Sequence, residues 1–78
     1  MDIKHAFGRV IARRRSQLKL SQDSLCERAG IDRSFLSEIE NGKFQPTLTT
    51  IFLIARALDC FPSEIIKELE DLDPVVEP

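Results

Sequence analysis

Few residues of this 78-residue chain have the types and spacing that catalysis or metal binding requires. His5 is the only histidine, and the sequence shows no evident cysteine or aspartate partner for it, so we expect it on the surface of the first helical turn. Cys26 and Cys60 lack metal-ligand spacing and are too few for a disulfide framework, so we expect reduced, packed thiols. Neither a glycine-rich phosphate loop nor a catalytic carboxylate pair is evident. These features argue against an enzyme and predict no metal or other cofactor.

The segment "DRSFLSEIENGK", residues 32–43, mixes a guanidinium, hydroxyls, carboxylates and an amide, as does a helix that enters a DNA groove. Its charge is unexpected, because Asp32, Glu38 and Glu40 outnumber Arg33 and Lys43. The whole chain has a net charge of −2. Residues 1–46 carry nine basic and six acidic side chains, a net +3, whereas residues 47–78 carry two and seven, a net −5. A locally basic part is sufficient for nucleic-acid binding, although both runs could be solvated helix faces.

Helix start and stop signals divide the chain into five segments. Apolar spacing predicts a helix over about 3–18, and Ser21 and Gly30 bound a short helix over about 22–29. Asp32 can cap a third helix that Asn41-Gly42 ends, and Thr47 caps a fourth over 48–58. Pro62 suits the first position of a fifth helix, which runs to about Glu70. No two-residue alternation appears, so the sequence predicts an all-α domain over residues 1–72 with a frayed acidic tail, 73–78.

The fourth of these helices, "LTTIFLIARAL", is apolar on nearly every side. Leu48 and Phe52 lie on one face with other apolar residues, and Leu53 and Ile54 lie on another. A helix of this kind is expected to be buried on nearly all sides.

The second and third helices have the features of a helix-turn-helix unit. Cys26 is small where the two helices must cross closely, and Gly30 permits a left-handed turn. Ile31, Leu36 and Ile39 supply apolar contacts that would fix the crossing. The spacing alone also fits an ordinary pair of antiparallel helices in a bundle.

Residues 20–58 resemble the phage-repressor/Cro-like (XRE) helix-turn-helix family. The shared features are "LSQ" at 20–22, Gly30 in the turn, "SEIENGK" at 37–43, Pro46, and "IARAL" at 54–58. The resemblance covers about residues 5–70 and implies a five-helix, repressor-like transcription regulator that binds operator DNA, usually as a symmetric dimer. In size it is similar to the controller proteins of restriction–modification systems. Cys26 departs from the family's usual alanine, which leaves an oxidation-sensitive site open.

The resemblance implies that Arg33, Ser34, Ser37 and Glu38 read bases from a recognition helix over 33–41 in the major groove. Their chemistry is suitable, because arginine can bind guanine O6 and N7, glutamate can accept from cytosine N4, and serine can serve either base. A phosphate contact is the alternative role for Arg33. Asp32 is expected to cap the helix rather than to read a base.

Phosphate contacts are expected at the helix N-terminus that carries Gln22. The resemblance implies further phosphate contacts in the loop after the recognition helix. The full set of candidates is Gln22, Asn41, Lys43, Gln45, Arg13, Arg14 and Gln17, with Lys19 as a further possibility. Not all of them can face DNA, because successive helical residues point in different directions.

The resemblance further implies a partly buried ion pair between Arg15 and Glu40, which would neutralise that carboxylate. Phe44 has no obvious family counterpart. It could fold back onto the domain or lie against sugar and phosphate beside Lys43.

Apolar side chains of the fourth and fifth helices exceed one inward face and predict a homodimer. The expected interface is Leu53, Ile54, Phe61, Ile65, Ile66 and Leu69; a monomer with a thick core is the alternative. An antitoxin that masks a partner toxin and binds DNA secondarily is the competing function. Neither a membrane span nor a signal peptide is evident, which predicts a cytoplasmic protein. The expected partners are double-stranded DNA and a second copy of the chain, and no small-molecule ligand is expected.

Overall fold

The computed structural model describes residues 1–78 and contains five helices. These are α1 (Ile3–Gln17), α2 (Gln22–Ala29), α3 (Arg33–Glu40), α4 (Leu48–Ala57) and α5 (Pro62–Asp71). The all-α fold predicted from the sequence is confirmed, and every helix begins and ends within a residue or two of its expected bounds. None of the five helices combines the length and the apolarity that crossing a bilayer would require.

Side-chain caps explain where most of the helices begin. The side chains of Asp2, Ser21 and Thr47 each accept a hydrogen bond from a backbone N–H in the first turn of the helix that follows. Asp32 occupies the corresponding position before α3, but its carboxylate makes no capping hydrogen bond. The expectation that this carboxylate is occupied by backbone N–H groups is therefore wrong, and Asp32 stays exposed.

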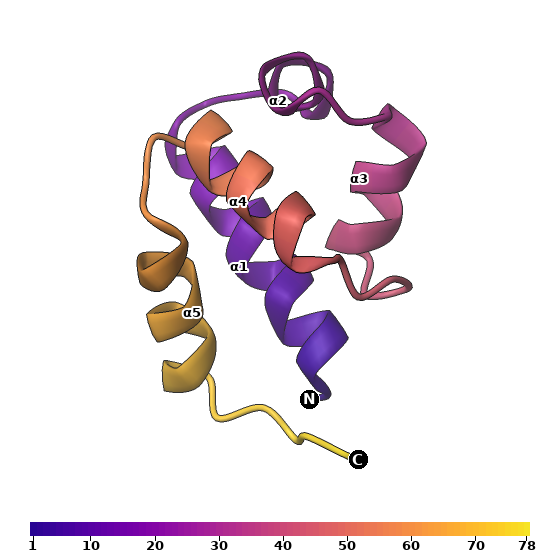
Figure 1. The fold of residues 1–78 in the computed structure, drawn as a ribbon, viewed down its shortest axis with the longest axis vertical. Coiled ribbons are helices and arrows are strands. Elements are labelled where there is room, and N and C mark those ends of the chain that lie inside the picture. Colours follow the sequence, from indigo (N-terminus) through magenta and orange to yellow (C-terminus); the bar gives the residue numbers. More distant parts are fainter.

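The helices are arranged around α1, which runs through the middle of the molecule (Figure 1). α3 and α5 contact α1 from different sides, and α2 contacts both α3 and α4. α4 packs against α5 and closes the domain. α2 and α3 consequently share one end and flank of the molecule, with α5 on the other flank (Figure 1).

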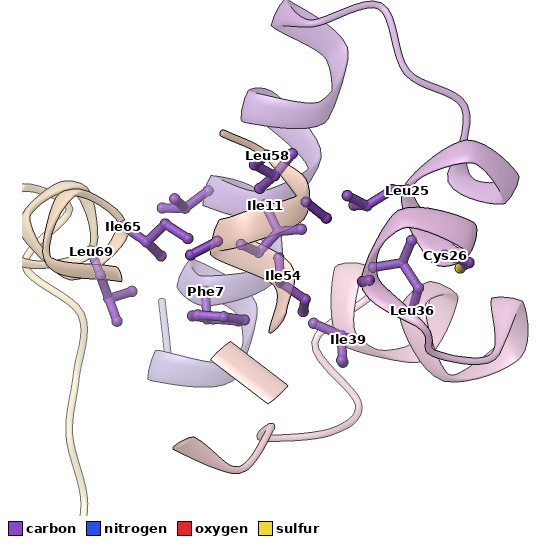
Figure 2. Close-up of a cluster of buried hydrophobic side chains, with 14 of the residues drawn as sticks. Phe7, Ile11, Leu25, Cys26, Leu36, Ile39, Ile54, Leu58, Ile65 and Leu69 are labelled. Atoms are coloured by element: carbon purple, nitrogen blue, oxygen red, sulfur yellow. The ribbon is translucent and has the colours of Figure 1, made fainter. Parts of the chain in front are cut away.

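The core contains side chains from all five helices. Figure 2 shows Ile11 and Ile54 near its centre, between Ile65 on α5 and Leu25 on α2. Seven of its aliphatic side chains are fully buried: Val10, Ile11, Leu25, Leu36, Ile39, Ile54 and Ile65. Burial of an aliphatic side chain of this size stabilises the fold by roughly 1.5–3 kcal/mol, so this cluster is the main source of stability.

α4 is buried on one side only, which corrects the expectation that it would be buried nearly all round. Leu48 is 70% exposed and Phe52 is 46% exposed. The reason is geometric: in a domain of five short helices, α4 has neighbours on its core side but none on its outer side.

Gly8 is required by the close approach of α1 to α3. A Cβ atom at this position would lie 2.3 Å from the carbonyl oxygen of Ile39 and 2.7 Å from that of Glu40. Both carbonyls belong to the C-terminal end of α3, so the backbone of α3 rests directly on the backbone of α1. Only glycine permits this distance.

The C-terminal tail is held at one point rather than frayed throughout. The backbone N–H of Val75 donates to the carbonyl oxygen of Met1 over 2.9 Å, and Asp2 and Val75 form an isolated parallel bridge. The two ends of the chain accordingly lie close together (Figure 1).

Candidate nucleic-acid interface

α2 and α3 form a helix-turn-helix unit with a fixed crossing. Gly30 ends α2 in the left-handed conformation at φ 71°, and its N–H donates to the carbonyl oxygen of Cys26. Leu25, Leu36 and Ile39 are fully buried between the two helices and the rest of the core. The outer face of α3 is therefore presented by a rigid support.

Cys26 is buried at this crossing, as the small-residue requirement predicts. Its burial raises the pKa of the thiol, and the nearby Asp23 carboxylate raises it further. The thiolate is the form that reacts with oxidants, so both effects disfavour an oxidation-sensitive role for this residue.

The four expected base readers lie on the same side of α3. Arg33, Ser34, Ser37 and Glu38 stand at positions i, i+1, i+4 and i+5, opposite the buried Leu36. Arg33 and Ser34 are exposed, and Ser37 and Glu38 are half-buried. The structure brings these four polar side chains together on the side of α3 that faces away from the core.

Arg15 and Glu40 form the ion pair between α1 and the end of α3. Arg15 Nε and Nη2 donate to the two carboxylate oxygens of Glu40 over 2.8 and 3.0 Å. Arg15 Nη1 also donates to the carbonyl oxygen of Leu20 over 2.8 Å. The Glu40 side chain is only 7% exposed, and its hydrogen bonds to the guanidinium raise the pKa of Arg15. The carboxylate charge of Glu40 is thus compensated inside the protein.

Gln22 extends this ion pair across α2. Its Nε2 donates to Glu40 Oε1 over 3.0 Å, while its Oε1 accepts from Arg33 Nε over 3.1 Å. The orientation of the amide is unambiguous, because a carboxylate can only accept and a guanidinium can only donate. The predicted phosphate contact of Gln22 must therefore use its second amide hydrogen or its backbone N–H at the start of α2.

Arg33 also binds Asp23, in a contact that the sequence did not predict. Arg33 Nη1 donates to Asp23 Oδ1 over 3.3 Å. The side chains are 61% and 70% exposed, so the pair lies on the surface at the start of α3. Neither spacing nor motif indicated it, because the two residues are ten positions apart and meet only through the turn.

Two carboxylates on this side of the molecule have no compensating partner. Neither Glu38 nor Asp32 makes an ion pair within the chain, and Asp32 is exposed. Glu38 therefore remains available to accept a hydrogen bond from a base amino group.

The expected phosphate ligands divide into two groups. Arg14 is corrected: its guanidinium pairs with Glu68 and lies 4.0 Å from Glu64, both on α5. Its side chain is only 19% exposed, so it joins two helices rather than facing DNA. Arg13 and Lys43 are exposed and form no ion pair, and they remain candidates.

The other phosphate candidates are polar and exposed. Gln17 is the last residue of α1, and Asn41 Nδ2 makes a long contact of 3.5 Å to Ser37 Oγ. Gln45 lies beside Lys4 and Glu77 in a shallow pocket near the N-terminus of α1.

Phe44 folds back toward α3 while remaining half exposed. Its ring lies 5.9 Å from the ring of Phe35, with an angle of 49° between the two planes. This contact supports the first of the two expectations for Phe44. His5 lies on the surface of the first turn as expected, but Asp2 accepts from its backbone N–H and lies 2.9 Å from its Nδ1. That partner was not recognised in the sequence.

Three of the six expected interface residues are part of the core instead. Ile54 and Ile65 have no exposed surface, and Leu69 has 8%. Side chains that are already enclosed cannot add contact area to a partner, so this half of the expected interface is wrong. Phe61 is 72% exposed and Ile66 is 40% exposed, while Leu53 is half-buried, and these three reach the surface.

The comparisons with known proteins agree with this geometry. Residues 11–65 match the helix-turn-helix family model. The control protein C.MunI from Mycoplasma sp is 34% identical over 70 residues, which span 88% of this chain and 95% of that protein. The restriction–modification controller protein C.AhdI from Aeromonas hydrophila has a similar structure, with a TM-score of 0.77 and 34% identity over 78% of this chain and 92% of that one.

A further solved structure is that of the restriction–modification controller protein C.Esp1396I, a tetramer in complex with its natural 35 base-pair operator. It matches with a TM-score of 0.77 over 90% of this chain and 97% of that chain, and at 24% identity it supports the fold alone. The family model agrees with the relatives whose chains are matched over nearly their full length. The chain belongs to the helix-turn-helix family of DNA-binding transcription regulators.

Proposed function

We propose that this regulator binds a pseudo-palindromic operator as a homodimer, with residues 33–41 of each copy in the major groove. Arg33, Ser34, Ser37 and Glu38 read base edges in this proposal. Gln22, Asn41 and Lys43 contact phosphates, with support from Gln45, Arg13 and Gln17. The protein acts in the cytoplasm, where such an operator would lie.

The observation that carries the proposal is the network beneath the reading face of α3. The recognition segment is acidic, yet Glu40 receives Arg15 and Gln22 and is almost fully enclosed. An uncompensated carboxylate at that position would repel phosphate, and Arg15 removes that charge without occupying the outer face of the helix. The reading face therefore keeps Ser34, Glu38 and part of the Arg33 guanidinium free for bases.

The homodimer is supported by exposed apolar surface on α4 and at the start of α5. Phe61 and Ile66 are exposed, and Leu48 and Phe52 form a further apolar strip on the outer side of α4. A two-fold dimer would place the two recognition helices about 34 Å apart, one turn of B-DNA. C.Esp1396I binds its operator as a tetramer, so a protein with this fold can place several copies on one DNA site.

The relatives favour a narrower role as a controller protein. C.MunI and C.AhdI are both controllers, and each is covered by this chain over more than nine-tenths of its own length. We therefore propose that this chain controls a restriction–modification operon by occupying its operator.

The decisive experiment is selection of bound sites from random duplex DNA at stated salt, followed by the same selection with Arg33→Ala. Direct readout predicts loss of preference at one base pair in each half-site, with other positions unchanged. A uniform loss would instead make Arg33 a phosphate contact, and the salt slope of log K would then fall by about 0.9 for each contact removed. Absence of any preferred site in the unmodified protein would contradict the proposed function itself.

A further inference from the structure

Arg33 is held from two directions before any DNA is present. Its Nε is bound by the Gln22 amide oxygen at 3.1 Å and its Nη1 by the Asp23 carboxylate at 3.3 Å. Nη2 makes no hydrogen bond within the chain. Nη2 and the second N–H of Nη1 therefore remain for a ligand, and these are the groups that bind guanine O6 and N7 in a bidentate contact.

The two acceptors differ in what fixes them. Gln22 is anchored, because its Nε2 is bonded to Glu40, which is itself bound by Arg15. Asp23 lies on the first turn of α2 and is exposed. Its side chain makes one hydrogen bond to the rest of the protein, the one to Arg33. Gln22 fixes one atom of the guanidinium, and a second contact restricts rotation of the guanidinium plane further. Asp23 provides that second contact.

We propose that Asp23 is a specificity-determining residue that acts through Arg33: with Gln22 it orients the guanidinium toward a guanine at one position of each half-site. This inference rests on the proposed base-reading role of Arg33. Asp23 does not touch the DNA in this proposal and is a positioning residue. In the proposed complex its carboxylate would also face the phosphate backbone, where a negative charge weakens binding to every sequence.

These two effects of Asp23 have opposite signs, which makes them separable. If the Arg33 side chain becomes ordered only when it binds guanine, its rotamer entropy is lost on binding, and this cost weakens the contact with guanine. Removing Asp23 should therefore lower discrimination between guanine and other bases while raising affinity for unrelated DNA. A residue that only shaped the fold would not produce this combination.

The experiment measures binding of Asp23→Ala, Asp23→Asn and the unmodified protein to the selected operator, to operators with the guanine replaced, and to unrelated duplex DNA. We expect Asp23→Ala to reduce discrimination at that base pair about three- to tenfold, because the arginine is then oriented by Gln22 alone. Asp23→Asn removes the charge but keeps an acceptor oxygen, so we expect it to retain more of the discrimination. Both variants should bind unrelated DNA more tightly.

Two controls isolate the positioning role. In an Arg33→Ala background, Asp23→Ala should leave the base preference unchanged, because the oriented group is gone. Asp71→Ala removes a similarly exposed carboxylate, paired with Lys67 at 3.1 Å on α5, and should leave discrimination unchanged. Thermal melting of each variant verifies that the fold persists.

The possible outcomes separate the two proposals. Full discrimination in Asp23→Ala, whether or not affinity rises, would overturn the positioning role and leave Asp23 as a repulsive charge only. If Arg33→Ala weakens all sequences equally, Arg33 does not read a base; its base-reading role and the inference on Asp23 then fail together, while operator binding by the protein stands. Loss of discrimination with Arg33→Ala but not with Asp23→Ala would remove only the inference on Asp23.

Discussion

The Arg15–Glu40 pair is a nearly buried contact that joins α1 to the end of the proposed recognition helix. The Glu40 carboxylate accepts hydrogen bonds from Arg15 and Gln22. The side-chain oxygen of Gln22 in turn accepts a hydrogen bond from Arg33. Removal of Arg15 would leave a nearly buried charge with a single amide donor. Such a group retains most of its desolvation cost after its partner is lost.

We expect Arg15→Ala to lower the free energy of unfolding by about 2–3 kcal/mol and to weaken operator binding. Urea denaturation and a binding titration at the same salt measure the two effects. Lys67→Ala is the matched control, because its pair with Asp71 is exposed and its loss should leave the free energy of unfolding nearly unchanged. Unchanged melting of Arg15→Ala would contradict the structural role of the pair.

At the level of single residues, the sequence predicted which side chains lie on the outer face of α3 but not how they are connected. Arg33 and Glu38 follow from helical spacing and from the family resemblance. The Asp23–Arg33 contact depends on rotamers and on the shape of the turn, which no periodicity encodes. The residue type of Asp32 indicates a cap, yet its carboxylate makes no capping hydrogen bond. Residue type indicates what a side chain can do, and local geometry decides whether it does so.

At the level of elements, the contact of α1 with α3 depends on one missing side chain. Gly8 lies within van der Waals distance of the carbonyl groups at the end of α3. Those carbonyls are backbone atoms and cannot move as a flexible side chain would. Any larger residue must therefore push the two helices apart, and with them the Arg15–Glu40 pair.

We expect Gly8→Ala to destabilise the domain by about 1–3 kcal/mol, in spite of the higher helix propensity of alanine. Gly30→Ala is the informative comparison: an added Cβ meets nothing within 4 Å there, so only the strain of φ 71° remains. We expect Gly8→Ala to lower the melting temperature more and to weaken operator binding as well. A stabilised Gly8→Ala variant would show that α1 and α3 can separate without cost.

The helices themselves were predictable because caps, glycines and prolines stand at nearly every end. The burial of α4 was not predictable. Apolar residues all around a helix indicate that every side is covered, but they do not indicate by what. In this chain Leu48, Phe52 and Phe61 are exposed. Ile54 and Ile65, two of the expected interface residues, lie in the core instead.

At the level of the whole molecule, the exposed apolar surface is the basis of the proposed dimer. We expect the protein to sediment as a dimer at tens of micromolar, and Phe61→Asp to shift it to a monomer, because a carboxylate cannot be buried without a partner. Ser16→Asp adds the same charge on the exposed side of α1 and should leave the dimer intact. An unmodified protein that sediments as a monomer at this concentration would contradict the dimer. Loss of the dimer should also weaken operator binding far more than binding to a single half-site.

The hydrogen bond between Val75 and Met1 has a consequence for chain connectivity. Because the two ends of the described chain meet, a short peptide could join them without bending any helix, and the loop between α3 and α4 or between α4 and α5 could then be opened instead. Such a circular permutant would keep every core contact while changing the order in which the helices are synthesised. Its refolding rate would reveal whether α1, which α3 and α5 both contact, must come first.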